Sequence, residues 1–78
     1  MGKINREAII LLNRIKEPGV DKKELIGFCD HYLELMSYYG VSTEIRKKLY
    51  NYSFNPTKNK EKIINIAEST LISIVEKI

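Results

Sequence analysis

Apolar residues recur along this chain at the three- and four-residue spacing of amphipathic α-helices, in four stretches that turn residues separate. The breaks fall at Pro18-Gly19, at Gly40 and at Asn55-Pro56. The pattern predicts helices over residues 3–16, 22–39, 43–53 and 56–77. Because short connections place consecutive helices side by side, we expect an all-α fold, a small antiparallel four-helix bundle with a short third helix. The 78 residues are expected to form a single domain, 1–78.

Capping residues mark the ends of the second and third predicted helices. Asp21, followed three residues later by Glu24, resembles a capping box and predicts the start of the second helix. Gly40 is suited to the left-handed position just after that helix. Ser42 is a good N-cap for the third helix. These local signals make the second helix the best defined element of the sequence.

The fourth predicted helix has a less distinct start. Asn55 can cap it with Pro56 at the first helical position, and Thr57 is a rival cap. Many of the apolar residues that follow are β-branched, which lowers helix propensity slightly. The stripe spacing and the lack of Gly or Pro after Pro56 still favour a helix over a strand.

Residues at shared stripe positions form the predicted core. They are Ala8, Leu11, Ile15, Leu25, Cys29, Tyr32, Met36, Ile45, Leu49, Ala67, Leu71 and Ile74. Further large apolar residues exceed what these stripes need, namely Ile9, Ile10, Ile63 and Ile72. This surplus predicts an additional contact surface, including one between two copies of the chain.

The sequence offers no arrangement of groups suited to catalysis. Cys29, Asp30 and His31 are adjacent, but neighbours on a helix point about 100° apart and cannot converge on one atom. Cys29 lies on the apolar stripe, so we expect it to be a buried, unligated thiol, with His31 on the opposite side. The chain holds one Cys and one His, too few for a zinc site of those ligands. We therefore predict a protein that is not an enzyme and uses no cofactor or metal.

Cysteine content and hydropathy also bear on location. A single cysteine rules out an internal disulfide framework and fits a reducing compartment. The apolar run from Ala8 to Leu12 is too short for a secretory signal or a membrane span. Arg6 stands where a myristoylation motif requires Ser or Thr. We expect a cytoplasmic protein without a transmembrane segment.

Positive charge is concentrated in one region. The net charge is +3, and residues 44–62 hold six of the 13 Lys and Arg residues against two of the 10 Asp and Glu residues. A local positive field attracts phosphate, anionic lipid or acidic protein, whereas a solvated helix face is the structural alternative. The residues predicted to bind an anionic partner are Arg46, Lys47, Lys48, Tyr50, Lys58, Lys60 and Lys62.

Aromatic residues overlap this basic region. All seven lie between residues 28 and 54, and only Tyr38 and Tyr50 fall off the apolar stripes. Basic and aromatic side chains together can contact phosphates and stack on bases. Residues 36–49 also resemble a helix-turn-helix turn, with Gly40 as the turn glycine and a basic helix after it. Nucleic acid is therefore one partner class to consider.

A second resemblance covers most of the chain. It has a helix, a long second helix, a short third helix that carries Leu49-Tyr50-Asn51-Tyr52, and a final helix. In this order it resembles the immunity proteins of pediocin-like bacteriocins, which are small, basic, cytoplasmic four-helix bundles. The resemblance implies a protein that binds a toxin–receptor complex and catalyses nothing. Two function classes thus remain open: a protein-binding module of this kind, and a small nucleic-acid-binding regulator.

Overall fold

The computed structural model of the chain describes residues 3–76 and forms a small all-α bundle of four helices. The order of the elements is β1 (Lys3–Ile4), α1 (Arg6–Ile15), α2 (Lys22–Tyr38), α3 (Thr43–Ser53), α4 (Lys60–Thr70), the 3-10 helix η1 (Leu71–Ser73) and β2 (Val75–Glu76). The helix α2 has 17 residues, whereas α3 has 11, which agrees with the expected short third helix.

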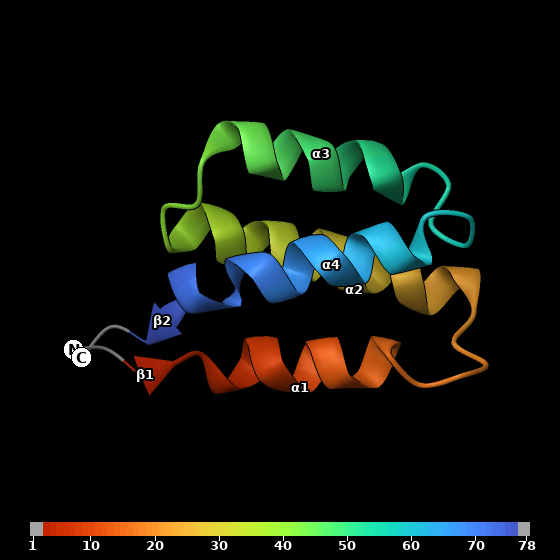
Figure 1. Cartoon of the computed structure of the whole chain (residues 1–78), viewed down its shortest axis with the longest axis horizontal. Coiled ribbons are helices and arrows are strands. Elements are labelled where there is room, and N and C mark those ends of the chain that lie inside the picture. The colour runs from red at the N-terminus through yellow and green to blue at the C-terminus, as the bar shows by residue number, and fades with distance from the viewer. Residues whose placement is uncertain (1–2, 77–78) are drawn as a thin grey trace.

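Successive helices run in alternating directions, so each lies antiparallel to the next (Figure 1). The helices α2 and α4 form the middle of the bundle, with α1 on one side and α3 on the other. The molecule is correspondingly flat, with extents of 36 × 24 × 17 Å. One consequence is that α3 packs only through the side that faces α2 and α4, and its outer side stays open to solvent.

The predicted ends of α2 and α3 are confirmed. The side chain of Asp21 accepts a hydrogen bond from the Glu24 amide at 2.8 Å, and that of Ser42 accepts one from the Ile45 amide at 3.4 Å. Gly40 has a φ of +77°, and the Val41 amide donates to the Met36 carbonyl at 2.8 Å. This is the hydrogen-bond pattern by which a glycine closes a helix.

The first helix begins three residues later than predicted. Lys3–Ile4 form a strand, and α1 starts at Arg6 with Asn5 as its N-cap. The Asn5 side chain accepts a hydrogen bond from the Ala8 amide at 3.1 Å and donates one to the Tyr39 hydroxyl at 2.7 Å. Asparagine is among the strongest N-caps, because its side chain bonds an amide that the helix leaves unpaired. The prediction was wrong because it did not use this signal.

The fourth helix is shorter than predicted at both ends. Residues 55–59 form hydrogen-bonded turns around the buried Pro56, and α4 starts at Lys60 after Asn59, whose φ of −101° and ψ of 14° lie outside the helical range. At the other end, the Thr70 hydroxyl donates to the Ile66 carbonyl at 2.8 Å, and the chain then continues as η1 and β2. The predicted end at Lys77 lies outside the described residues.

The two short strands hold the ends of the described chain together. The strand β1 pairs antiparallel with β2, with Lys3 opposite Glu76 and Ile4 opposite Val75. The Asn5 amide extends this pairing with a 3.0 Å hydrogen bond to the Ile74 carbonyl. Extended structure suits the β-branched residues near the end of the chain, which explains why the helix does not continue there.

Most of the predicted core is confirmed, but in two helices the buried stripe is rotated slightly from the predicted one. The buried apolar side chains are Ala8, Leu12, Ile15, Leu25, Phe28, Cys29, Tyr32, Met36, Val41, Leu49, Ile63, Ala67 and Ile74. Three predicted core residues, Leu11, Ile45 and Leu71, are only partly buried against this cluster. The apolar surplus is also corrected in part, because Ile63 is fully buried, whereas Ile10 and Ile72 are 61% and 78% exposed.

Candidate functional site

The structure divides the predicted basic site among different parts of the bundle. Arg46 and Lys47 project from α3 on the side of α2 and line one hollow together with Tyr50. Lys48 follows Lys47 by about 100° around the helix and therefore projects from a different side. Of the seven predicted residues, the hollow thus brings together Arg46, Lys47 and Tyr50.

Three of the predicted cations have partners within the fold. The Arg46 guanidinium donates to the Val41 carbonyl and to the Thr43 hydroxyl, both at 3.2 Å. Lys60 donates to the Glu17 carbonyl at 3.1 Å, which ties the start of α4 to the turn after α1. Lys62 lies over the Tyr52 ring, 5.7 Å from its centroid. Among the described residues, Lys47, Lys48 and Lys58 make no such bond and keep their charge available to solvent.

A hollow between α2 and α3 brings together one part of the predicted site. Its volume is about 210 Å³, and it is lined by Leu33 of α2 and by Thr43, Arg46, Lys47 and Tyr50 of α3. The α3 residues recur at positions i, i+3, i+4 and i+7, the spacing that places side chains on one face of a helix. The hollow therefore joins an apolar surface to two positive charges.

An exposed aromatic pair continues this face. Phe54 packs edge-on against Tyr50, with ring centroids 4.9 Å apart and an interplanar angle of 77°. The two residues are 69% and 54% exposed, although aromatic residues of this size ordinarily bury most of their surface. We use the name "α3 face" for Thr43, Arg46, Lys47, Tyr50 and Phe54.

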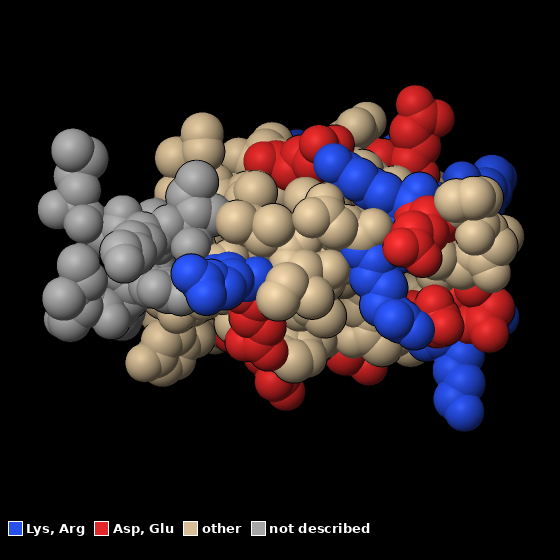
Figure 2. Space-filling view, turned by 90° about the horizontal axis from the view of Figure 1, so that it is seen from below, with Lys and Arg blue, Asp and Glu red and all other residues tan. Residues whose placement is uncertain are grey.

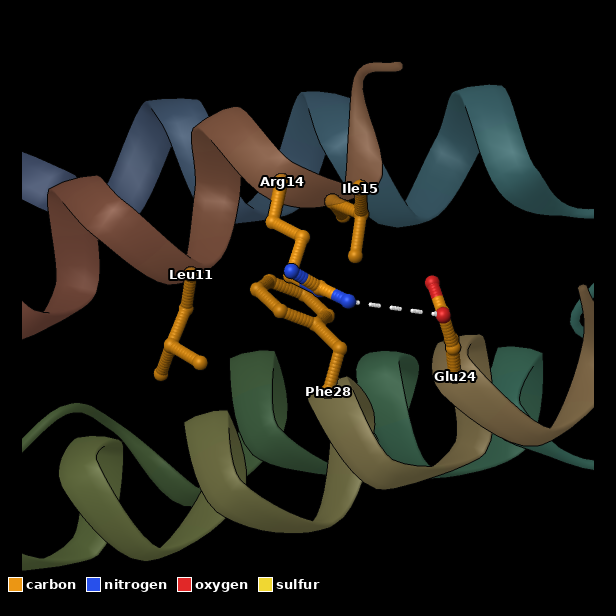
Figure 3. Close-up of a pocket in the computed structure, with 5 residues that line it drawn as sticks. All are labelled: Leu11, Arg14, Ile15, Glu24 and Phe28. Atoms are coloured by element: carbon orange, nitrogen blue, oxygen red, sulfur yellow. Dashed lines mark ion pairs between the residues drawn. The ribbon is translucent and has the colours of Figure 1, made fainter. Parts of the chain in front are cut away.

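A second hollow lies between α1 and α2 and differs in its charge. It has a volume of about 160 Å³, with Leu11, Arg14 and Ile15 from α1 and Glu24 and Phe28 from α2 (Figure 3). Arg14 and Glu24 point toward each other, and their nearest charged atoms are 3.6 Å apart. The cation of this hollow is thus already neutralised by a carboxylate of the same chain.

The face of the bundle that carries α1 also shows mixed charge. Figure 2 views the molecule from that side, and basic and acidic side chains alternate there around a central area that is neither. Lys16 and Glu68 pair across α1 and α4 at 2.9 Å, and His31 approaches Glu7 at 2.7 Å across α1 and α2. Among the described residues on this side, acidic groups accompany the basic ones, in keeping with the balanced charge of residues 1–43.

Cys29 occupies the environment that the sequence predicted. Its side chain is fully buried and free of a disulfide, whereas His31 lies on the exposed side of α2. Burial, followed by the negative charge of Asp30, raises the pKa of the Cys29 thiol from 9.0 to about 11. Within residues 3–76, no cluster of three or more His, Cys, Asp or Glu residues could hold a metal ion. Each helix within these residues is too short or too polar to span a bilayer.

We predict that Cys29 reacts slowly with thiol reagents in the folded protein. A buried thiol with a raised pKa presents little of the reactive thiolate. Labelling by a disulfide reagent at pH 8 should therefore be slow until denaturant is added. Because the folded state favours the protonated thiol, its contribution to stability is present below pH 9 and is lost as the pH rises through about 11. Fast labelling without denaturant, or retained stoichiometric zinc, would contradict this expectation.

Sequence reasoning missed three residues that shape the α3 face. Phe54 was not assigned to it, although its position four residues after Tyr50 places the two rings together. Thr43 was assigned no role, but its hydroxyl fixes the Arg46 guanidinium. Leu33 comes from another helix, so only the packing of α2 against α3 brings it into the hollow.

Searches with this chain match no protein-family model, no curated protein and no solved structure.

Proposed function

We propose that this protein is a non-enzymatic binding module that recognises another protein through its α3 face. The observation that carries the proposal is the exposed Tyr50–Phe54 pair beside a hollow with unneutralised positive charge. Aromatic residues and Arg are enriched where protein interfaces derive most of their binding energy. A ring that stays largely in solvent contributes little to the fold, and a partner that covers both rings would gain their burial.

A nucleic-acid partner is less well supported. Binding to phosphates depends on several cations that face the same backbone, and here Lys60 and Lys62 have intramolecular partners away from Lys47. A helix-turn-helix motif needs its two helices at about 90–120°, so that the second can enter the major groove. The helices α2 and α3 instead run alongside each other (Figure 1). The support for a nucleic-acid-binding regulator is therefore limited to the basic and aromatic composition of this region.

The resemblance to immunity proteins of pediocin-like bacteriocins suggests what the partner is. We propose that this chain protects a cell from such a toxin by binding the toxin–receptor complex, and that it does so in the cytoplasm. The supporting features are the antiparallel four-helix arrangement, an unpartnered α3 face, and a free, buried cysteine that fits a reducing compartment.

A survival assay tests this proposal. A bacterial strain sensitive to pediocin-like bacteriocins should become resistant to at least one member of a toxin panel when it expresses the wild-type chain. The double variant Tyr50→Ala, Phe54→Ala should lose most of this protection, because truncation removes both exposed rings from the contact surface.

The control is the exposed apolar residue Ile72, which is 78% exposed but lies in η1, away from the α3 face. Ile72→Ala should protect as wild type does, and immunoblots should show equal amounts of each variant. Equal protection by the double variant would exclude the α3 face as the contact surface, and no protection by the wild-type chain would contradict the immunity role.

A further inference from the structure

The hollow between α2 and α3 has the two components of a site for an apolar group that carries a negative charge. Leu33 and the Tyr50 ring supply apolar surface, and Arg46 and Lys47 supply positive charge beside it. Arg46 is held in place by the Val41 carbonyl and the Thr43 hydroxyl, so little side-chain freedom is lost when it meets a ligand. Among the described residues, no carboxylate lines this hollow.

Its size indicates which kind of ligand fits. The volume of about 210 Å³ is smaller than the roughly 300–1,000 Å³ of sites for drug-sized molecules. It suits a single large side chain from a partner, with the rest of that partner resting on Tyr50 and Phe54. The comparable hollow between α1 and α2 lacks free positive charge, since Arg14 is paired with Glu24.

We infer that the partner presents an acidic segment whose large apolar side chain enters the α2–α3 hollow while a neighbouring carboxylate meets Lys47 and Arg46. This inference rests on the proposed protein-binding function and adds the chemistry of what is bound. Charge complementarity selects the acidic segment, because the hollow carries two cations and, among residues 3–76, no carboxylate forms an ion pair with Lys47.

A fragment titration tests the inference with a defined probe. The probe is 3-phenylpropionate, which joins an aromatic ring to a carboxylate, and its controls are 3-phenylpropanol and 3-phenylpropylamine. We expect the carboxylate to shift the methyl NMR signals of Leu33 and to bind roughly 2- to 5-fold more tightly than the alcohol, as expected for a partly exposed charge pair. The amine should bind more weakly than the alcohol.

Two adjacent lysines provide the matched variants. Lys47→Gln should weaken the preference for the carboxylate to the part that Arg46 supplies, whereas Lys48→Gln, on another side of α3, should leave it unchanged. The methyl signals of Leu11 and Ile15 report on the α1–α2 hollow and should show no preference for the carboxylate.

Some outcomes would overturn the inference. These are equal affinity for the three fragments, the same charge preference at both hollows, or a preference that Lys47→Gln leaves undiminished. If any of these occurs while the Tyr50→Ala, Phe54→Ala variant still loses protection, the acidic segment is rejected and the proposed function stands. If the carboxylate preference is present but that variant protects fully, the hollow binds acidic groups and the α3 face is not the functional surface.

Discussion

Leu49→Ala is expected to lower the free energy of unfolding by about 2–5 kcal/mol, the cost of a cavity left by a buried leucine. Leu49 is fully buried and is the one residue of α3 in the buried core. A domain of this kind has a total stability of only about 5–15 kcal/mol, so this loss is a large fraction of it. Urea denaturation followed by far-UV circular dichroism measures the loss.

The neighbouring position provides the control for this truncation. Lys48→Ala changes an exposed side chain of the same helix and should alter stability by less than about 0.5 kcal/mol. Leu11→Ala should cost less than Leu49→Ala, because Leu11 is only partly buried. Equal denaturation midpoints for Leu49→Ala and wild type would mean that α3 does not pack through this residue.

The second large effect is expected at Asn5. Asn5→Ala removes the buried N-cap bond to the Ala8 amide and the partly buried bond to the Tyr39 hydroxyl. Loss of a cap costs about 0.5–2 kcal/mol, and a buried hydrogen bond contributes about 0.5–1.5 kcal/mol. We expect a combined loss of about 1–3 kcal/mol, measured by thermal and urea unfolding.

Two milder changes separate these contributions. Asn5→Asp keeps an oxygen that can accept from the Ala8 amide but removes the donor to Tyr39, and Tyr39→Phe removes only the acceptor hydroxyl. Each should lower the free energy of unfolding by less than Asn5→Ala does. If Asn5→Ala is as stable as wild type, the junction between β1 and α1 does not hold the end of the bundle together.

The sequence predicts those parts of the fold that depend on neighbouring residues. The ends of α2 and the start of α3 follow from Asp21, Gly40 and Ser42, whose effects act within one turn. The pairing of β1 with β2 joins residues more than 70 positions apart, and no local pattern in two-residue strands reveals it. The end of α4 was therefore predicted wrongly, because a tertiary contact overrides its helical periodicity.

Where two apolar residues are adjacent in a helix, it is equally hard to predict which of them faces the core. The spacing predicts Ile64 in the stripe that contains Ala67 and Ile63 beside it, but the packing of the bundle buries Ile63 in the core and leaves Ile64 only partly buried. The candidate site shows the same limit. Lys47 and Lys48 are equivalent in a count of charge, but the helix turns them to different sides, and only Lys47 lines the hollow.

Contacts within the bundle also engage two of the lysines that the sequence pattern assigns to one site. Lys60 meets the carbonyl of Glu17, which lies 43 residues earlier in the chain, and Lys62 meets the ring of Tyr52. These contacts depend on how α4 packs on α1 and α3, so charge clustering along the sequence overestimates the number of lysines without an intramolecular contact. What remains is a smaller site in which Arg46 and Lys47 lie beside exposed aromatic rings.

Charge reversal at the two adjacent lysines tests most directly whether the α3 face is the binding surface. In the survival assay, Lys47→Glu should lose most of the protection, because it places a negative charge at the mouth of the hollow, whereas Lys48→Glu should protect as wild type does. The free energy of unfolding of both variants should lie within about 0.5 kcal/mol of that of wild type, since both lysines are exposed. Equal protection by the two variants, or a loss confined to Lys48→Glu, would contradict the assignment of the α3 face.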